Sequence, residues 1–217
     1  SFVETCIVDL ADDAVEQLGL QGGYINVPEA KTPLNLANPS SSNSLVVIPG
    51  LHTAYWFYQE ANGIQNLNMP DIGSMEKEIA NYVNENLLDC ASRFSNFNFE
   101  VSNENPKTTA EIREKNIIIT TKLPVTIAKN LTSVSLEKFS ASIEKPLGEL
   151  YTNARQILEY ETQSNFLEEK TLDMFVVYDE IPYSGINFEC SQKTWQRLNV
   201  LRNIKAILSN NIQYLKV

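Results

Sequence analysis

The sequence predicts an α+β fold, with long amphipathic helices packed on a four-stranded antiparallel β-meander. Two observations lead to this prediction. Near both ends of the chain, apolar residues recur every three or four positions, as they do along one face of a helix. In the middle they recur every second position, as they do in strands with one polar face. With 217 residues, 43% of them hydrophobic, the chain is long enough to bury a core.

The first expected helix covers residues 2 to 20 and carries Cys6 on its apolar stripe. Gly22 and Gly23 follow it and suit a left-handed C-cap, because glycine adopts positive φ without strain. Beyond them the sequence predicts a loop rich in Pro, Asn and Ser at residues 28 to 44, a short strand at 45 to 48 and an extended aromatic run at 55 to 58.

A second long helix is expected from Ser74, which can cap it, to about Phe94. Cys90 lies on its apolar stripe, in line with Met75, Ile79, Val83 and Leu87. After this helix the apolar period changes from that of a helix to that of a strand. The alternating stretches are residues 97 to 101, 117 to 119, 123 to 127 and 134 to 143, with a phase slip at Glu137-Lys138 that predicts a β-bulge.

Helices return after Pro146, because proline is favoured at the first position of a helix. A capping box of Asn165 and Glu168 predicts another helix, and a short strand is expected at residues 186 to 190. The last predicted helix carries Trp195, Leu198, Leu201, Ile204 and Leu208. We treat residues 1–217 as a single domain with a helical part at 1–95, the meander at 96–145 and a second helical part at 146–217.

The charge and the motifs exclude several functions. A net charge of −10 and a pI near 4.7 argue against nucleic-acid binding, which needs a basic face. The single histidine, His52, lies in a predicted loop without a nucleophile motif, so a histidine-based catalytic set has no support. The sequence shows neither clustered metal ligands nor a glycine-rich phosphate loop. We therefore expect no enzyme and no cofactor.

The cysteines carry the most information. Cys6 and Cys90 each point into a predicted core, which is typical of an inert buried thiol or of half a disulfide. Both alternatives remain open; we favour the disulfide, which would indicate an oxidising compartment. Cys190 is either buried beside Trp195 or paired with a cysteine outside these residues, and we favour the second.

Two surface features are candidates for binding or modification. In the run Tyr55-Trp56-Phe57-Tyr58 the side chains alternate, so one pair can be buried while the other meets a partner. Packing under the following loop explains this run without a ligand. Stacking on a sugar or a protein is the functional alternative, with Tyr55, Trp56 and Tyr58 as the binding residues. Asn130 opens the sequon Asn130-Leu131-Thr132 in a predicted turn and is a candidate glycosylation site.

The ends of the chain and four of its stretches lead to an expectation about its placement. Ser1 already lies in a helical pattern and a strand-like pattern stops at Val217, so we expect further residues on both sides, a membrane anchor among them. The four stretches are residues 2 to 6, 18 to 25, 55 to 58 and 75 to 90. Together they resemble uncharacterised archaeal cell-surface proteins that are held by an N-terminal membrane helix. The resemblance covers chiefly residues 2–95 and implies a position outside the membrane, with no activity attached.

The sequence therefore predicts a non-enzymatic extracytoplasmic domain of a membrane-anchored surface protein, working in adhesion, assembly or scaffolding. A protein partner or self-assembly is expected, no nucleic acid, and membrane contact only through a segment outside these residues. The alternative is a carbohydrate- or peptide-binding module that uses Tyr55 to Tyr58, with a glycan as partner. An enzyme built on dispersed carboxylates is a third reading and would need a cleft with two facing acids of shifted pKa.

Overall fold

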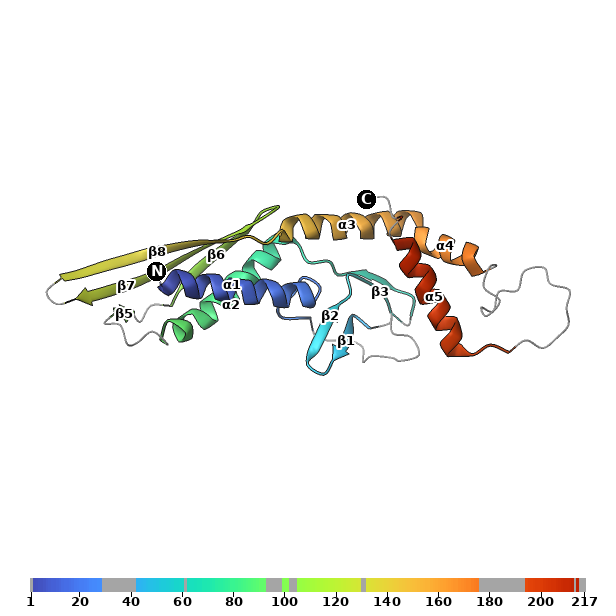
Figure 1. Cartoon of the computed structure of the whole chain (residues 1–217), viewed down its shortest axis with the longest axis horizontal. Coiled ribbons are helices and arrows are strands. Elements are labelled where there is room, and N and C mark those ends of the chain that lie inside the picture. Colours follow the sequence, from blue (N-terminus) through green and yellow to red (C-terminus); the bar gives the residue numbers. More distant parts are fainter. Residues whose placement is uncertain are drawn as a thin grey trace. The chain divides into compact units, whose positions relative to one another are not determined.

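The structure, a computed structural model, describes residues 2–28, 42–60, 62–92, 99–101, 105–129, 132–175, 194–212 and 214. Its class is α+β, as predicted (Figure 1). The chain divides into two compact units, residues 1–149 and 150–217. The sequence analysis treats the chain as one domain, and the division lies close to its expected boundary between the meander and the second helical part.

The first unit contains two helices, two small hairpins and a larger sheet. The helices are α1 (Phe2–Leu20) and α2 (Ile72–Ser92). The hairpins are formed by β1 (Ser44–Ile48) with β2 (Leu51–Ala54), and by β3 (Phe57–Gln59) with β4 (Gln65–Leu67). The larger sheet contains β5 (Phe99–Val101), β6 (Lys107–Ile112), β7 (Ile117–Lys129) and β8 (Thr132–Ile143).

The predicted four-stranded meander is wrong: β6, β7 and β8 pair in their order along the chain, but β5 pairs with β7 instead of β6. β7 is central and β8 pairs along one of its edges. The β7 residues that pair with β5 or β6 also pair with β8, so β5 and β6 must lie on the other edge of β7. They pair with different parts of that edge. All these pairs are antiparallel. Because β5 and β6 share one edge of β7, the four strands form a sheet only three strands wide.

Two details of the sheet differ from the sequence pattern and one agrees with it. The stretches predicted separately at 117 to 119 and 123 to 127 belong to the single strand β7. Strand β6 was not predicted, because threonines take the place of aliphatic residues in its alternation. The predicted bulge is confirmed: the register shifts between Lys122 and Val125, opposite the phase slip in β8.

The core of the first unit lies between the helices and one face of the sheet. α1 packs on α2 and β8, and α2 packs on β6. These helices and the central strand β7 bury apolar side chains with 0–1% exposure, namely Ile7, Leu18, Met75, Ile79, Val83, Leu87, Ile117, Ile119 and Leu123. The spacing of these residues in the helices is the one that predicted the two amphipathic faces.

The second unit contains most of α3 (Leu147–Ser164), which begins in the first unit, and α4 (Phe166–Phe175) and α5 (Arg197–Ile212). α4 packs on α5. The apolar stripe predicted for the last helix is largely uncovered: Leu198 is 75% exposed and Leu201 42%, and Trp195 lies before the helix begins. The strand predicted at residues 186 to 190 lies outside the described residues.

Candidate functional site

Cys6 of α1 and Cys90 of α2 are joined by a disulfide bond, which confirms the favoured alternative. Their Cα atoms lie 5.9 Å apart, within the usual range for bridged cysteines. Cys6 is only 1% exposed, so its half of the bond is part of the core. The bond spans 84 residues of sequence, which corresponds to about 4.5 kcal/mol of stabilisation in the chain-entropy model.

The turn after α1 requires glycine at two positions. Gly22 and Gly23 have φ angles of 74° and 91°, and the Gly23 amide donates to the Leu18 carbonyl at 2.8 Å, as in the predicted C-cap. A Cβ atom on Gly22 would lie 2.7 Å from the carbonyl oxygen of Ala54. One on Gly23 would lie 2.5 Å from Cγ of Pro70. Larger residues would therefore strain the backbone and also push neighbouring segments away.

The end of α1 is bound by the end of β2 and by Trp56, which lies between the two hairpins. The last carbonyl groups of a helix have no partner within it. Three donors supply partners for successive carbonyls: Thr53 Oγ1 bonds Leu20 at 2.8 Å, the Ala54 amide bonds Gln21 at 3.1 Å, and Trp56 Nε1 bonds Gly22 at 2.7 Å. The hairpins are thus fixed to the C-terminal end of α1.

The same turn is fixed to α2. One carboxylate oxygen of Glu78 accepts hydrogen bonds from the Asn26 amide at 2.9 Å and from the Ile25 amide. The Tyr24 hydroxyl donates to the Asn68 carbonyl at 2.9 Å, close to the start of α2. The disulfide near one end of the helix pair and these bonds near the other therefore hold α1 and α2 together along their length.

α2 begins at Ile72 and is capped by Asp71, whereas the sequence predicted Ser74 as the cap. The Asp71 carboxylate accepts from the Ser74 amide at 3.0 Å and from the Ser74 hydroxyl at 2.6 Å. Both bonds favour the ionised form of Asp71 and so lower its pKa, and the bond from the Ser74 hydroxyl has the larger effect. The serine is thus a donor to the cap and lies inside the helix.

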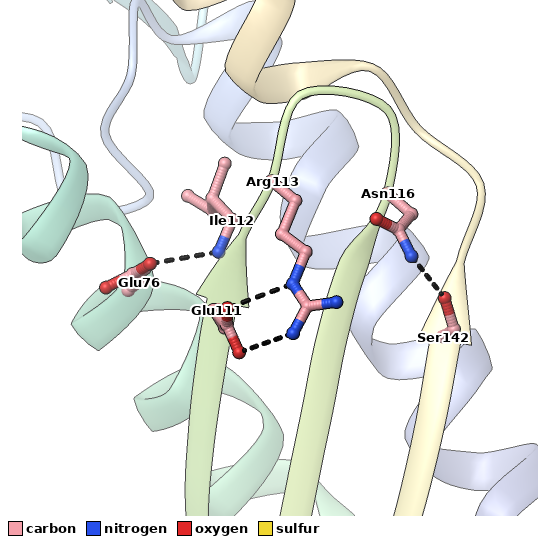
Figure 2. A network of polar contacts seen from close by, with 6 residues as sticks. All are labelled: Glu76, Glu111, Ile112, Arg113, Asn116 and Ser142. Atoms are coloured by element: carbon pink, nitrogen blue, oxygen red, sulfur yellow. Dashed lines mark hydrogen bonds and ion pairs between the residues drawn. The ribbon is translucent and has the colours of Figure 1, made fainter.

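Two side chains of α2 bind the outer edge of β6. Glu76 Oε1 accepts from the Ile112 amide at 2.9 Å (Figure 2), and Asn84 Oδ1 accepts from the Thr108 amide at 2.9 Å. Eight residues of helix span roughly 12 Å and four residues of strand roughly 13 Å, so the two bonds match in spacing. Because these amides are occupied, this edge is closed to strand addition by another chain. Nothing in the sequence pattern of α2 marks these two residues.

The aromatic run does not form a cluster of rings. Trp56 holds the end of α1, and Tyr58 is only 8% exposed. Tyr55 is half-buried, and Phe57, which was not among the candidate binding residues, is the exposed member of the run. Two of the three candidate binding residues thus have structural roles. Sequence patterns do not predict the bond from Trp56, because its acceptor is a main-chain oxygen more than thirty residues away.

The hairpins expose apolar side chains. Ile48 is 59% exposed and Leu67 is 67% exposed, and smaller exposed fractions are found for Leu45, Val46, Phe57 and Ile64. A single exposed aliphatic residue is ordinary, but several on two short hairpins are typical of a surface that contacts another protein.

In the second unit Glu161 is the carboxyl group with the most altered environment. Its pKa is raised to about 7, first by burial and then by a hydrogen bond with Glu168. Both of its oxygens accept from the Leu167 amide, at 3.0 and 3.3 Å, near the start of α4. The group lines an open depression of about 490 Å³ between α3, α4 and α5. Its bonds explain it as a helix cap, so it gives no support to a carboxylate-based enzyme.

The remaining predicted residues do not contribute to a site. Asn130 and Cys190 lie outside the described residues. His52 is exposed and belongs to strand β2, where the sequence predicted a loop. Within the described ranges, no group of three or more His, Cys, Asp or Glu side chains could hold a metal ion. No helix in the part of the chain that the structure describes has the length and apolarity to span a membrane.

Comparison with protein-family models, with curated proteins and with solved structures found no match for this chain.

Proposed function

We propose that this chain is a non-enzymatic extracytoplasmic domain of a membrane-anchored surface protein, working in adhesion, assembly or scaffolding. The observation that carries the proposal is the Cys6–Cys90 disulfide. Disulfides of this structural kind persist in oxidising compartments and are rare in the cytosol. The resemblance of residues 2–95 to archaeal cell-surface proteins supports the same placement and supplies the anchor, a helix outside these residues.

The disulfide and the hydrogen bonds around α1 support a role in which the domain presents a preformed surface to a partner. The disulfide and Glu78 hold α1 to α2, and Thr53, Ala54 and Trp56 hold the hairpins to the end of α1. The exposed apolar side chains of the hairpins therefore belong to segments that these bonds hold in place. Such pre-ordering lowers the entropy cost of binding, which favours a protein partner or a second copy of the chain at the hairpins.

The alternative of a carbohydrate- or peptide-binding module built on Tyr55, Trp56 and Tyr58 is less favoured. Sugar stacking needs a free ring face on an exposed aromatic residue. Tyr58 is buried, and Tyr55 and Trp56 are only partly exposed.

The placement is tested on protein isolated from its native cells with thiols blocked at lysis. Cys6 and Cys90 should take up no alkylating reagent until a reductant is added, as read by peptide mass spectrometry. The protein should also be degraded when intact cells are treated with a protease. Reduced cysteines, or a protein protected from protease until the cells are opened, would contradict the proposal.

The role in assembly is tested by changing the hairpins. The double variant Ile48→Ser/Leu67→Ser should weaken self-association or partner cross-linking at least tenfold, measured by analytical ultracentrifugation and by cross-linking on intact cells. Leu198→Ser, which changes an equally exposed leucine of α5, is the matched control and should have no effect. Unchanged association of the double variant would exclude the hairpins from the interface, and equal losses in both variants would show that the effect is not specific to the hairpins.

A further inference from the structure

A row of three lysines crosses the solvent-facing side of the larger sheet. Lys107 of β6 pairs directly with Lys122 of β7, and Lys122 pairs directly with Lys138 of β8. All three are exposed. Because neighbouring strands are about 4.8 Å apart, the row extends over roughly 10 Å. Among the described residues, none of the three ammonium groups makes an ion pair or a hydrogen bond.

This row is not explained by folding. Like charges that face each other directly across strands destabilise a sheet. On the opposite face of β6 and β7, the hydroxyl groups of Thr108 and Thr121 share a buried hydrogen bond of 2.8 Å, which stabilises the register that pairs Lys107 with Lys122. The chain as a whole is acidic, with a net charge of −10. Three unpaired cations in line therefore indicate a ligand of opposite charge.

The row borders a depression in the surface of the sheet. Its volume is about 350 Å³, and it is lined by Asn105, Lys107, Lys122, Pro124, Glu137 and Lys138. It lies at the bulge of β7, where Pro124 has no amide to offer the strand ladder. Glu137 contributes one negative charge, which leaves an excess of two positive charges.

A second row beside the lysines consists of hydroxyl groups. Thr109, Thr120 and Ser140 pair across the same three strands, two residues further along each. Residues two apart in a strand share a face, so the hydroxyl groups lie beside the ammonium groups on the solvent-facing side. Thr109 and Ser140 donate to main-chain carbonyl groups of β7 at 3.4 Å, and the hydroxyl groups of Thr120 and Ser140 lie 3.5 Å apart. The hydroxyl oxygens can therefore still accept hydrogen bonds from sugar hydroxyls.

The acidity of the rest of the chain does not prevent binding here. At physiological salt the field of an exposed charge is largely screened beyond about 8 Å. Glu111, the described acid further along β6, is four residues from Lys107, roughly 13 Å, and is paired with Arg113 (Figure 2). The three lysines, by contrast, are close enough to act on one ligand together.

We propose that the row Lys107–Lys122–Lys138 binds an acidic polysaccharide through its sulfate or carboxylate groups, with the hydroxyl row binding the sugars. A polymer with repeated charges can place a separate anionic group beside each of the three lysines, whereas a single small anion offers only one such group. Single-stranded nucleic acid would need aromatic side chains for stacking, and none is found on this face among the described residues of β6, β7 and β8. The proposal names a partner for the adhesion function above and rests on it for the choice of polysaccharide.

The test uses residues 1–217 with intact disulfide and four polymers: dextran sulfate, polygalacturonate, neutral dextran and oligo-dT. Dextran sulfate and polygalacturonate should bind in calorimetry at low salt, and neutral dextran should not. The variant Lys107→Gln/Lys122→Gln/Lys138→Gln should bind at least tenfold more weakly. Its plot of log affinity against log salt should lose about one unit of slope for each lysine.

Lys77→Gln/Lys115→Gln/Lys205→Gln is the matched control, since it changes the net charge equally at exposed lysines outside the row. It should bind like the wild type. Because the row variant removes a repulsion, its melting temperature should stay the same or rise, which excludes unfolding as the cause of lost binding. Equal losses in both variants, tighter binding of oligo-dT than of the acidic polysaccharides, or no binding to either acidic polymer would overturn the proposal. Any of these results would leave the cysteine and protease experiments unaffected, so the two proposals fail separately.

Discussion

The two units of the chain differ in how their helices are held. In the first, a disulfide joins α1 to α2, and both helices bury a continuous stripe of aliphatic residues. In the second, Leu150 is 60% exposed, Leu172 54% and Leu198 75%. Its ion pairs Arg155–Glu159 and Lys170–Asp173 lie at the surface, where such pairs contribute only about 0–1 kcal/mol.

The apolar period in the sequence is similar in both units, so the difference does not come from the helices alone. A helical stripe stabilises a fold only when another surface covers it. In the first unit the sheet and the second helix provide that surface. We therefore expect the first unit to be much more stable, and the four predictions below test this difference in order of decreasing effect.

Removing the disulfide should have the largest effect. Cys6→Ala/Cys90→Ala, or reduction of the wild type, should lower the free energy of unfolding of the first unit by about 4.5 kcal/mol, since the unfolded chain regains the entropy of an open loop. The chain has two tryptophans, one in each unit, so Trp195→Phe makes Trp56 the reporter of the first unit. Denaturant titration followed by fluorescence measures the loss. The stability of the second unit is measured by hydrogen exchange. An equal loss of stability there would mean that the two units unfold together.

Truncating a core side chain should have the next largest effect on stability and should distinguish the two units. Ile79 is 0% exposed, and Ile79→Ala should lower the stability of the first unit by about 2–5 kcal/mol through the cavity that it leaves. Leu201→Ala in α5 should change stability by less than about 0.5 kcal/mol, because this leucine is 42% exposed. Thermal unfolding of both variants provides the comparison, and similar losses would show that α5 is covered as well as α2.

The glycine turn gives a smaller effect with an internal control. Gly22→Ala should lower stability by at least about 1–2 kcal/mol, the cost of left-handed backbone for a residue with a Cβ atom. Gly19→Ala should be neutral or stabilising by up to about 1 kcal/mol, because Gly19 lies within α1 with open space around it. Denaturant midpoints measure both. A tolerated Gly22→Ala would mean that Ala54 can move away from the end of α1.

The smallest effect should be a pH dependence confined to the second unit. The pKa of Glu161 is raised from 4.5 to about 7, so the folded state binds its proton more tightly than the unfolded state does. Its contribution to stability is therefore complete below pH 4.5 and is lost as the pH rises through about 7. Glu161→Gln should flatten this part of the profile, measured by thermal unfolding with Trp195 as reporter. An unchanged profile would show that the carboxyl group ionises in the folded unit without penalty.

The sequence predicted most of the first unit's helical part because periodic stripes and buried cysteines are local signals. The stripes of α1 and α2, the C-cap at Gly22 and Gly23 and the bulge were found in this way. The pairing order of the strands was not, because threonine takes the place of aliphatic residues in β6 and because β5 pairs with β7, beyond the next strand of the chain. The apolar stripe of α5 was predicted, but its exposure to solvent was not, because periodicity does not indicate whether another surface covers the stripe.

The candidate site was less predictable because its bonds join distant segments. Trp56 was noticed for its ring, whereas the structure uses its nitrogen as a donor. The lysine row is invisible in the sequence: its members lie on three strands, and only the register aligns them. Glu76 and Asn84 look like ordinary polar residues of an exposed helix face, and their role depends on the edge of a strand formed later in the chain.

The position of the disulfide also has a consequence during synthesis. Cys90 leaves the ribosome 100 residues before Cys190, an interval on the order of 5–20 seconds at ordinary elongation rates. Throughout that interval Cys90 is the one cysteine of residues 1–217 with which Cys6 can pair. An oxidase that acts on the emerging chain would thus join the correct two cysteines before the third competes, so the order of translation itself protects against scrambled bonds.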